Sequence, residues 1–194
     1  MKKNSLLFIF IGLFLIACHN DYTPKPKAYL RLDYPAPKYQ TIKYDLPFSF
    51  DKNIIADPLI LKQLNSDNLS YGINLNYPDL KGTVFLTYKA IENDQKNLND
   101  FLRDAQKFTF EHTKMADEIP AYPYENRKQR VYGMLSVVKG NVASPAQFYV
   151  TDSTEHFLTG SLYFQTRPNY DSILPAASYI QKDMRHLMET LKWK

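Results

Sequence analysis

The chain has 194 residues and a net charge of +4, and 44% of its residues are hydrophobic. This supports one domain with a real core and excludes two full-sized domains. A single cysteine excludes an internal disulfide framework and a thiolate metal cluster, and no run of Lys and Arg exceeds two residues, which argues against a nucleic-acid partner. We therefore predict one domain without metal or cofactor.

The N-terminus has the pattern of a secretory signal. Lys2 and Lys3 precede an apolar run over residues 6–16, which is shorter than the roughly 20 residues that a helix needs to cross a membrane. A short basic region followed by such a run is typical of a signal peptide. Cleavage would remove both lysines and lower the net charge from +4 to +2.

Ala17-Cys18 follows the apolar run directly. A small residue before a lone cysteine at this place resembles the lipobox of bacterial lipoproteins, in which the cysteine sulfur carries a lipid. We expect a signal peptide over residues 1–17, a lipidated N-terminus and linker over 18–34, and one globular domain over 35–194. The alternative is an ordinary signal peptide in which Cys18 is incidental.

The first half of the mature chain predicts a spacer, short strands and one hairpin. Residues 19–29 are polar with alternating prolines, which favours extended backbone. Alternating apolar residues predict strands over 29–34, 71–77 and 83–89, the last two as a hairpin, and residues 47–50 form a short β-like piece. Asp57-Pro58 predicts the start of a short helix through residue 64.

The second half predicts two longer helices around three strands. Apolar residues at helical spacing indicate a helix over 97–113, with Asn97 as its N-cap, and Pro175 opens a final helix. Residues 116–129 are predicted to form a polar surface loop. Strands are expected over 131–138, 147–151 and 157–164. The pattern indicates an α+β fold with a mostly antiparallel sheet covered by two main helices, an arrangement that resembles the Mog1/PsbP class.

The sequence contains no strong catalytic motif. The four histidines are far apart and make no metal-ligand spacing. Asp152, Ser153 and His156 could be drawn as a triad, but they lack a nucleophile elbow and lie within one short turn. A hydrogen-bonded turn is the better interpretation, and we expect no enzyme activity.

Polar loops at the ends of the last three strands are the predicted partner-binding surface. In a meander, residues 140–147 and 167–172 would share one end of the sheet, and residues 152–156 would lie at the other. The proline-rich start of the mature chain is a second such segment. The candidate residues are Tyr22, Pro24, Arg31, Gly140, Asn141, Ser144, Pro145, Gln147, Asp152, His156, Asn169 and Asp171. Asp152-Ser153-Thr154 and Asp171-Ser172-Ile173 also resemble a short O-glycosylation sequence.

The chain resembles the gliding-motility lipoprotein GldD family of the Bacteroidota over nearly all of the mature sequence. The resemblance rests on the order and spacing of several blocks. These are Cys18 to Tyr22, Tyr22-Thr23-Pro24-Lys25-Pro26, Pro47-Phe48-Ser49-Phe50, Val131-Tyr132-Gly133, residues 140–148, Thr151-Asp152-Ser153, residues 168–172 and residues 190–194.

The resemblance implies a non-catalytic, lipid-anchored envelope protein required for gliding motility and type IX protein secretion. In that family the protein supports assembly or stability of the apparatus, so its partners are expected to be the membrane and other envelope proteins. We expect a periplasm-facing domain, with the choice of membrane and the oligomeric state open. The alternative is a periplasmic lipoprotein that binds or hydrolyses a glycan or a peptide.

Overall fold

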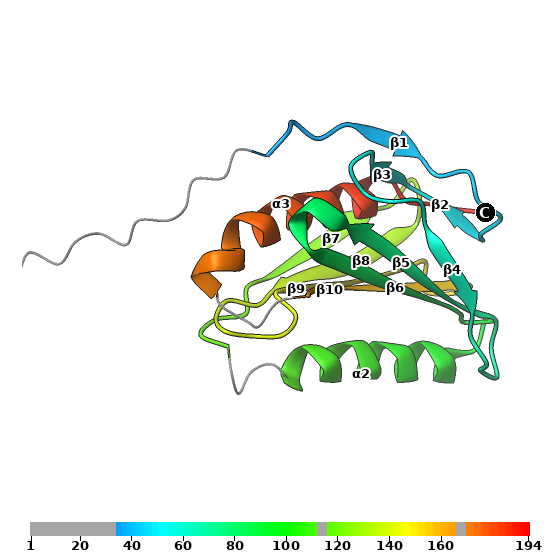
Figure 1. The fold of residues 1–194 in the computed structure, drawn as a ribbon. Coiled ribbons are helices and arrows are strands. Elements are labelled where there is room, and N and C mark those ends of the chain that lie inside the picture. Colours follow the sequence, from blue (N-terminus) through cyan, green and yellow to red (C-terminus); the bar gives the residue numbers. More distant parts are fainter. Residues whose placement is uncertain (1–33, 112–115, 166–169) are drawn as a thin grey trace, which may run out of the picture.

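The computed structural model describes residues 34–111, 116–165 and 170–194. An antiparallel sheet of seven strands, in the order β4-β5-β6-β10-β9-β8-β7, forms the centre of the fold. Its strands are β4 (Ile60–Gln63), β5 (Ser70–Tyr77), β6 (Gly82–Ala90), β7 (Ala121–Asn126), β8 (Val131–Val137), β9 (Ala146–Thr151) and β10 (His156–Phe164). Helix α3 (Tyr170–Thr190) covers one face and helix α2 (Gln95–Glu111) the other (Figure 1). The predicted α+β class is confirmed.

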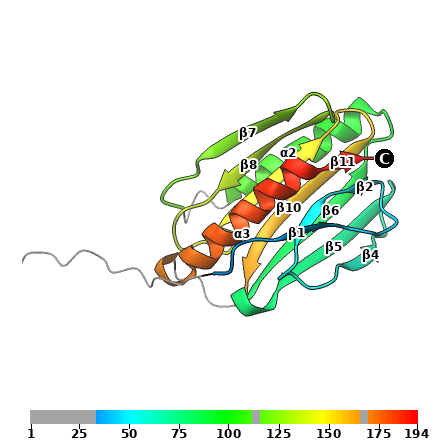
Figure 2. The ribbon, with the colours of Figure 1, turned by 90° about the horizontal axis from the view of Figure 1, so that it is seen from above.

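The larger core lies between α3 and the sheet. Helix α3 places an apolar stripe against the sheet face that Ile73, Val84 and Leu158 occupy. The stripe consists of Ile180, Met184, Leu187 and Met188, each at most 2% exposed. Figure 2 shows α3 lying over the sheet, with α2 behind it. Burial of this stripe is the main stabilising contact of α3.

Two small pairs of strands complete the α3 side. Strand β1 (Tyr39–Thr41) pairs with β3 (Asp51–Asn53), and β2 (Phe48–Ser49) pairs with β11 (Lys192–Trp193) at the C-terminus. A 3-10 turn, η1 (Pro78–Leu80), joins β5 to β6. The predicted hairpin of residues 71–77 and 83–89 and the β-like piece at 47–50 are therefore confirmed.

The expected helix after Asp57-Pro58 is wrong, because residues 60–63 form strand β4. The N–H of Asp57 donates to the carbonyl of Asn76 at 2.9 Å, and the N–H of Leu64 donates to Ser70 at 2.9 Å. These bonds align the segment along β5. A helix of about two turns has little stability of its own, so pairing with an existing sheet prevails.

The expected surface loop at residues 116–129 is also wrong in part, because it contains the edge strand β7. Its side chains are mostly exposed, so no apolar alternation marks it in the sequence. Pro123 lies within this strand and is tolerated because an edge strand does not need every N–H for pairing. The N–H of Val137 donates to the carbonyl of Pro120 at 2.9 Å, where the pairing begins.

Both helices begin earlier than predicted. Asp94, rather than Asn97, caps α2: its carboxylate accepts the N–H of Lys96 at 2.8 Å. Helix α3 begins at Tyr170, so Pro175 lies inside the helix and does not open it. The Asn141 side chain accepts the N–H of Tyr170 at 2.8 Å and ties this start to the loop after β8.

Candidate functional site

The described segments show what the predicted partner-binding residues do in the fold. Cys18, Tyr22, Pro24, Arg31 and Asn169, the spacer at 19–29 and most of the expected first strand lie outside the described residues. The Asn141–Tyr170 bond brings the loop after β8 to the start of α3, at one end of the sheet as the meander predicts. Asn141 and Asp171 are exposed there.

Several residues of the loop after β8 have clear structural roles. Gly140 has φ 113°, a conformation that favours glycine. Ser144 is fully buried, and its hydroxyl donates to the carbonyl of Ala146 at 3.3 Å. The carbonyl of Pro145 accepts the side chain of Gln181 on α3 at 3.4 Å. These contacts fix the loop against α3.

Asp152 organises the turn between β9 and β10, as the sequence suggests. Its carboxylate accepts the N–H groups of Thr154, Glu155 and His156 at 2.9–3.0 Å. Burial by itself raises the pKa of Asp152, but these backbone donors, with that of His156 foremost, outweigh it and hold the pKa below its usual value. The carboxylate is therefore a fixed anion that stabilises a turn.

His156 is held by packing at the opposite end of the sheet from Asn141. Its Nδ1 lies 2.8 Å from the Tyr88 hydroxyl, and its ring stacks on Trp193 with centroids 5.0 Å apart. Burial, aided by the charge of Asp152, raises the pKa of Tyr88 to about 12, so this hydroxyl keeps its proton at neutral pH. The histidine thereby joins β6, β10 and the C-terminal strand.

We expect His156→Gln to act through stability. Loss of the Tyr88 contact and of the ring stack should lower the free energy of unfolding by about 1–2 kcal/mol. Gliding should then fall only in step with protein abundance in cells. Ser153→Gly is the matched control: it removes the hydroxyl of the imagined triad and suits the φ of 70° at this position. A variant that melts and accumulates like the wild type, yet abolishes gliding, would contradict the structural role.

A buried polar cluster, absent from the sequence-based prediction, joins the N-terminal strands to α3. The Asp183 carboxylate, 5% exposed, accepts the Tyr39 hydroxyl at 2.7 Å and the Asn53 amide at 2.9 Å. The hydroxyl of Tyr77 on β5 bonds to the same carboxylate. The sequence contains a clue to this cluster, because Asp183 is a charged residue inside the apolar stripe of α3. A carboxylate at such a buried position is expected to have hydrogen-bonding or charged partners.

A groove of about 840 Å³ lies on the opposite face, between α2 and the sheet. Helix α2 packs on the sheet through Leu98 and Phe101, which meet Phe157, with Leu102 and Ala105 beside them. On the same face of the sheet, Phe85 is 42% exposed. The volume is in the range of ligand-binding sites.

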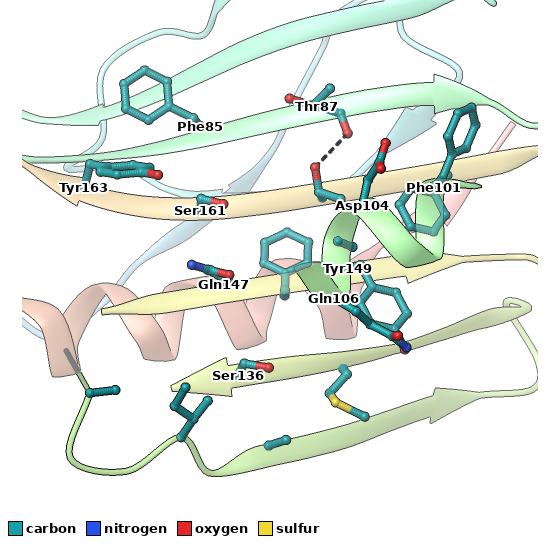
Figure 3. Close-up of a pocket in the computed structure, with 18 of the residues that line it drawn as sticks. Phe85, Thr87, Phe101, Asp104, Gln106, Ser136, Gln147, Tyr149, Ser161 and Tyr163 are labelled. Atoms are coloured by element: carbon teal, nitrogen blue, oxygen red, sulfur yellow. Dashed lines mark hydrogen bonds between the residues drawn. The ribbon is translucent and has the colours of Figure 1, made fainter. Parts of the chain in front are cut away.

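A row of polar side chains crosses the floor of this groove. Ser136, Gln147 and Ser161 are neighbours on β8, β9 and β10, and we call them the polar row. Figure 3 shows them one below another, with Phe85 and Tyr163 beside one end. Gln147 is 4% exposed. It is the one predicted binding residue that lines the groove among those described.

Aromatic rings and carboxylates complete the lining. Tyr149 stacks on Phe157 with centroids 5.9 Å apart, and Phe85 meets Tyr163 edge-on at 5.8 Å. Three acidic residues border the groove, and we call them the acidic rim: Asp104, Asp117 and Glu118. Among the described lining residues, the one cation is Lys89, whose ammonium lies 4.6 Å from the centre of the Phe101 ring.

In the described ranges no group of three or more His, Cys, Asp and Glu side chains is placed to hold a metal ion. Neither described helix has the length and apolar character needed to cross a membrane. The groove offers apolar rings, hydroxyls and an amide, which can orient a ligand by shape and hydrogen bonds.

Comparison with known proteins identifies the family. The family model described as gliding motility lipoprotein GldD matches residues 19–193 of the 194. Comparison with curated proteins and with solved structures gives no match, so the likeness to the Mog1/PsbP class stays a prediction. The chain therefore belongs to the gliding motility lipoprotein GldD family, whose members are envelope-associated components of gliding.

Proposed function

We propose that this protein is a non-catalytic, lipid-anchored binding protein of the cell envelope that supports assembly or stability of the gliding and type IX secretion apparatus. The family match supports the role in gliding. The observation that carries the binding role is the open groove between α2 and the sheet. Its size and mixed lining are those of a recognition site.

The non-catalytic part of the proposal rests on how the reactive side chains are used. Asp152 and His156 are the residues from which a hydrolytic site could be drawn. Asp152 bonds to three backbone N–H groups of its turn, and His156 lies between Tyr88 and Trp193. A general base must reach its nucleophile by a hydrogen bond, whereas Asp152 is bonded to its own turn and His156 is bonded to Tyr88 and stacked on Trp193.

The anchor is proposed at Cys18, with the domain facing the periplasm. Residues 18–33 would separate the lipid from the first described residue, Tyr34, which packs on α3 through Tyr179 with centroids 5.3 Å apart. A chain of this length reaches about 50 Å when extended. The α2 face, on the other side of the sheet (Figure 1), would thus be free to meet other envelope proteins.

Complementation of a deletion strain tests this function. We expect the deletion to abolish gliding and to reduce type IX secretion, and the wild-type gene to restore both. Cys18→Ala should prevent labelling by a clickable fatty acid and move the protein out of the membrane fraction, because two or three acyl chains supply stable anchoring. Normal gliding and secretion in the deletion strain would contradict the proposed role. Unchanged membrane association of the variant would contradict the anchor.

A further inference from the structure

We propose that the groove between α2 and the sheet binds an extended peptide segment of about six residues with apolar side chains and at least one basic residue. This inference rests on the proposed binding role and names the ligand class of that site. It is argued from the length, the hydrogen-bonding groups and the charge of the groove.

The length of the groove fits a short extended segment. Its lining crosses five adjacent strands, with Phe85 on β6 at one side and Ala121 on β7 at the other. Adjacent strands lie about 4.8 Å apart, so this distance is about 19 Å. An extended chain of about six residues spans it.

The hydroxyl groups of the polar row supply hydrogen bonds along this path. Ser136, Gln147 and Ser161 follow one another across three strands, and Thr87 and Thr159 lie in the neighbouring cross-strand row. Hydroxyls and amides both donate and accept, as the alternating N–H and C=O groups of a peptide require. An acyl chain would cover the Ser136 and Ser161 hydroxyls without offering either a hydrogen bond, which is costly.

The walls favour apolar side chains over a sugar. On one side lie Phe101 and Ala105 of α2, and on the other Met134 and Ile119. A glycan carries hydroxyls around each ring, and many of these would lose water against such walls without a partner. A peptide places apolar side chains against the walls and its backbone over the polar row.

The acidic rim favours a ligand that carries a positive charge. Asp104 and Asp117 are exposed at the groove, and Glu118 is fixed beside Lys139 at 2.7 Å. The segment holding Asp117 is tied to the end of β8, since its N–H donates to the Lys139 carbonyl at 2.9 Å. Carboxylates at the rim attract a basic side chain and repel fatty acids and phosphates.

The start of the described chain lies away from the groove. The described chain begins at Tyr34 against α3, on the face of the sheet opposite to the groove. The occupant is therefore assigned to a partner protein.

The test measures peptide binding to the full-length lipoprotein in nanodiscs by fluorescence anisotropy. The probe is a labelled peptide with blocked ends, Leu-Thr-Phe-Thr-Leu-Lys, and its counterpart has Glu in place of Lys. We expect the Lys peptide to bind and the Glu peptide to bind at least about fivefold more weakly. Asp104→Asn with Asp117→Asn should remove most of this preference. Asp100→Asn is the matched control, because Asp100 lies on the same helix, bonds to Arg103 and does not line the groove.

Two obstructing variants complete the test. Ser161→Phe should abolish binding, because the larger side chain fills the floor of the groove. Ala121→Trp, at an exposed position of the edge strand, should obstruct the groove without changing the packing of the core. Equal binding of the two peptides would overturn the proposal, as would undiminished binding by a normally folded Ala121→Trp. Tighter binding of palmitate or of an N-acetylglucosamine hexasaccharide would assign another ligand class. These measurements are made on purified protein, so a negative result would not contradict the proposed role in the cell envelope. Conversely, a deletion strain that glides normally would not change the result of the binding measurement.

Discussion

Gly133→Ala should lower the free energy of unfolding by about 3 kcal/mol or more, which corresponds to a fall in Tm of about 6–12 °C. A Cβ atom at this position of β8 would lie 1.9 Å from the carbonyl oxygen of Tyr149 on β9. The clash is with backbone, so it is relieved only by moving one strand away from the other. The two strands lie inside the sheet, so their separation would disturb the packing of the sheet against the helices on its two faces.

Gly72→Ala is the matched control for this substitution. Its Cβ would meet the end of the Leu64 side chain at 3.3 Å, which can move at little cost. We expect a change within about 1 kcal/mol. Urea unfolding followed by the fluorescence of Trp193, the single tryptophan, measures both variants. Similar losses in the two would show that the close approach at Gly133 is not the cause.

Asp183→Ala should also cost about 3 kcal/mol, because it removes the acceptor that three side-chain donors share, two of them buried. These are the Tyr39 hydroxyl, the Asn53 amide and the Tyr77 hydroxyl. Tyr39 and Asn53 belong to the paired strands β1 and β3, so their attachment to α3 should loosen first. Hydrogen exchange should rise over residues 39–53 more than over β9 and β10. Glu189→Ala, an exposed acid on the same helix, should change the free energy of unfolding by no more than about 0.5 kcal/mol.

The pH dependence of this site has a definite sign. Burial raises the pKa of Asp183 above its usual 3.8, and the hydrogen bonds from Tyr39, Asn53 and Tyr77 offset only part of that effect. The folded protein therefore binds this proton more tightly than the unfolded chain, so the contribution is stabilising below about pH 3.8 and is lost as the pH rises through the raised pKa. Asp183→Asn removes this titration. The stability of the wild type relative to Asp183→Asn should fall as the pH rises from 3 upward, and a flat difference would contradict a raised pKa.

Elements with a strong periodic pattern were predictable from sequence because local pattern and tertiary environment agree in them. The strands at 71–77 and 83–89 alternate between a buried face and a half-exposed one, and the stripe of α3 recurs at helical spacing. Strand β4 and strand β7 are edge strands with mostly exposed side chains, so they carry no such alternation. Their pairing depends on a neighbour that the local sequence does not reveal.

The groove was beyond sequence reasoning for a different reason. Ser136, Gln147 and Ser161 are separated along the chain, and only the register of β8, β9 and β10 makes them one row. Each alone is an ordinary polar residue in a strand. Gln147 was predicted as a binding residue from the loop before it, but its side chain lies on the α2 face, whereas Asp171 lies in the first turn of α3 on the other.

The sequence by itself determined the signal pattern, the α+β class, the family resemblance and the turn at Asp152. Each of these depends on residues close together or on the order of short blocks along the chain. Tertiary structure alone decided that Asp183 is the centre of a buried cluster, that β4 and β7 complete the sheet, and that α2 leaves a groove open. These features depend on which distant segments meet, and burial and strand pairing across the whole domain settle that choice.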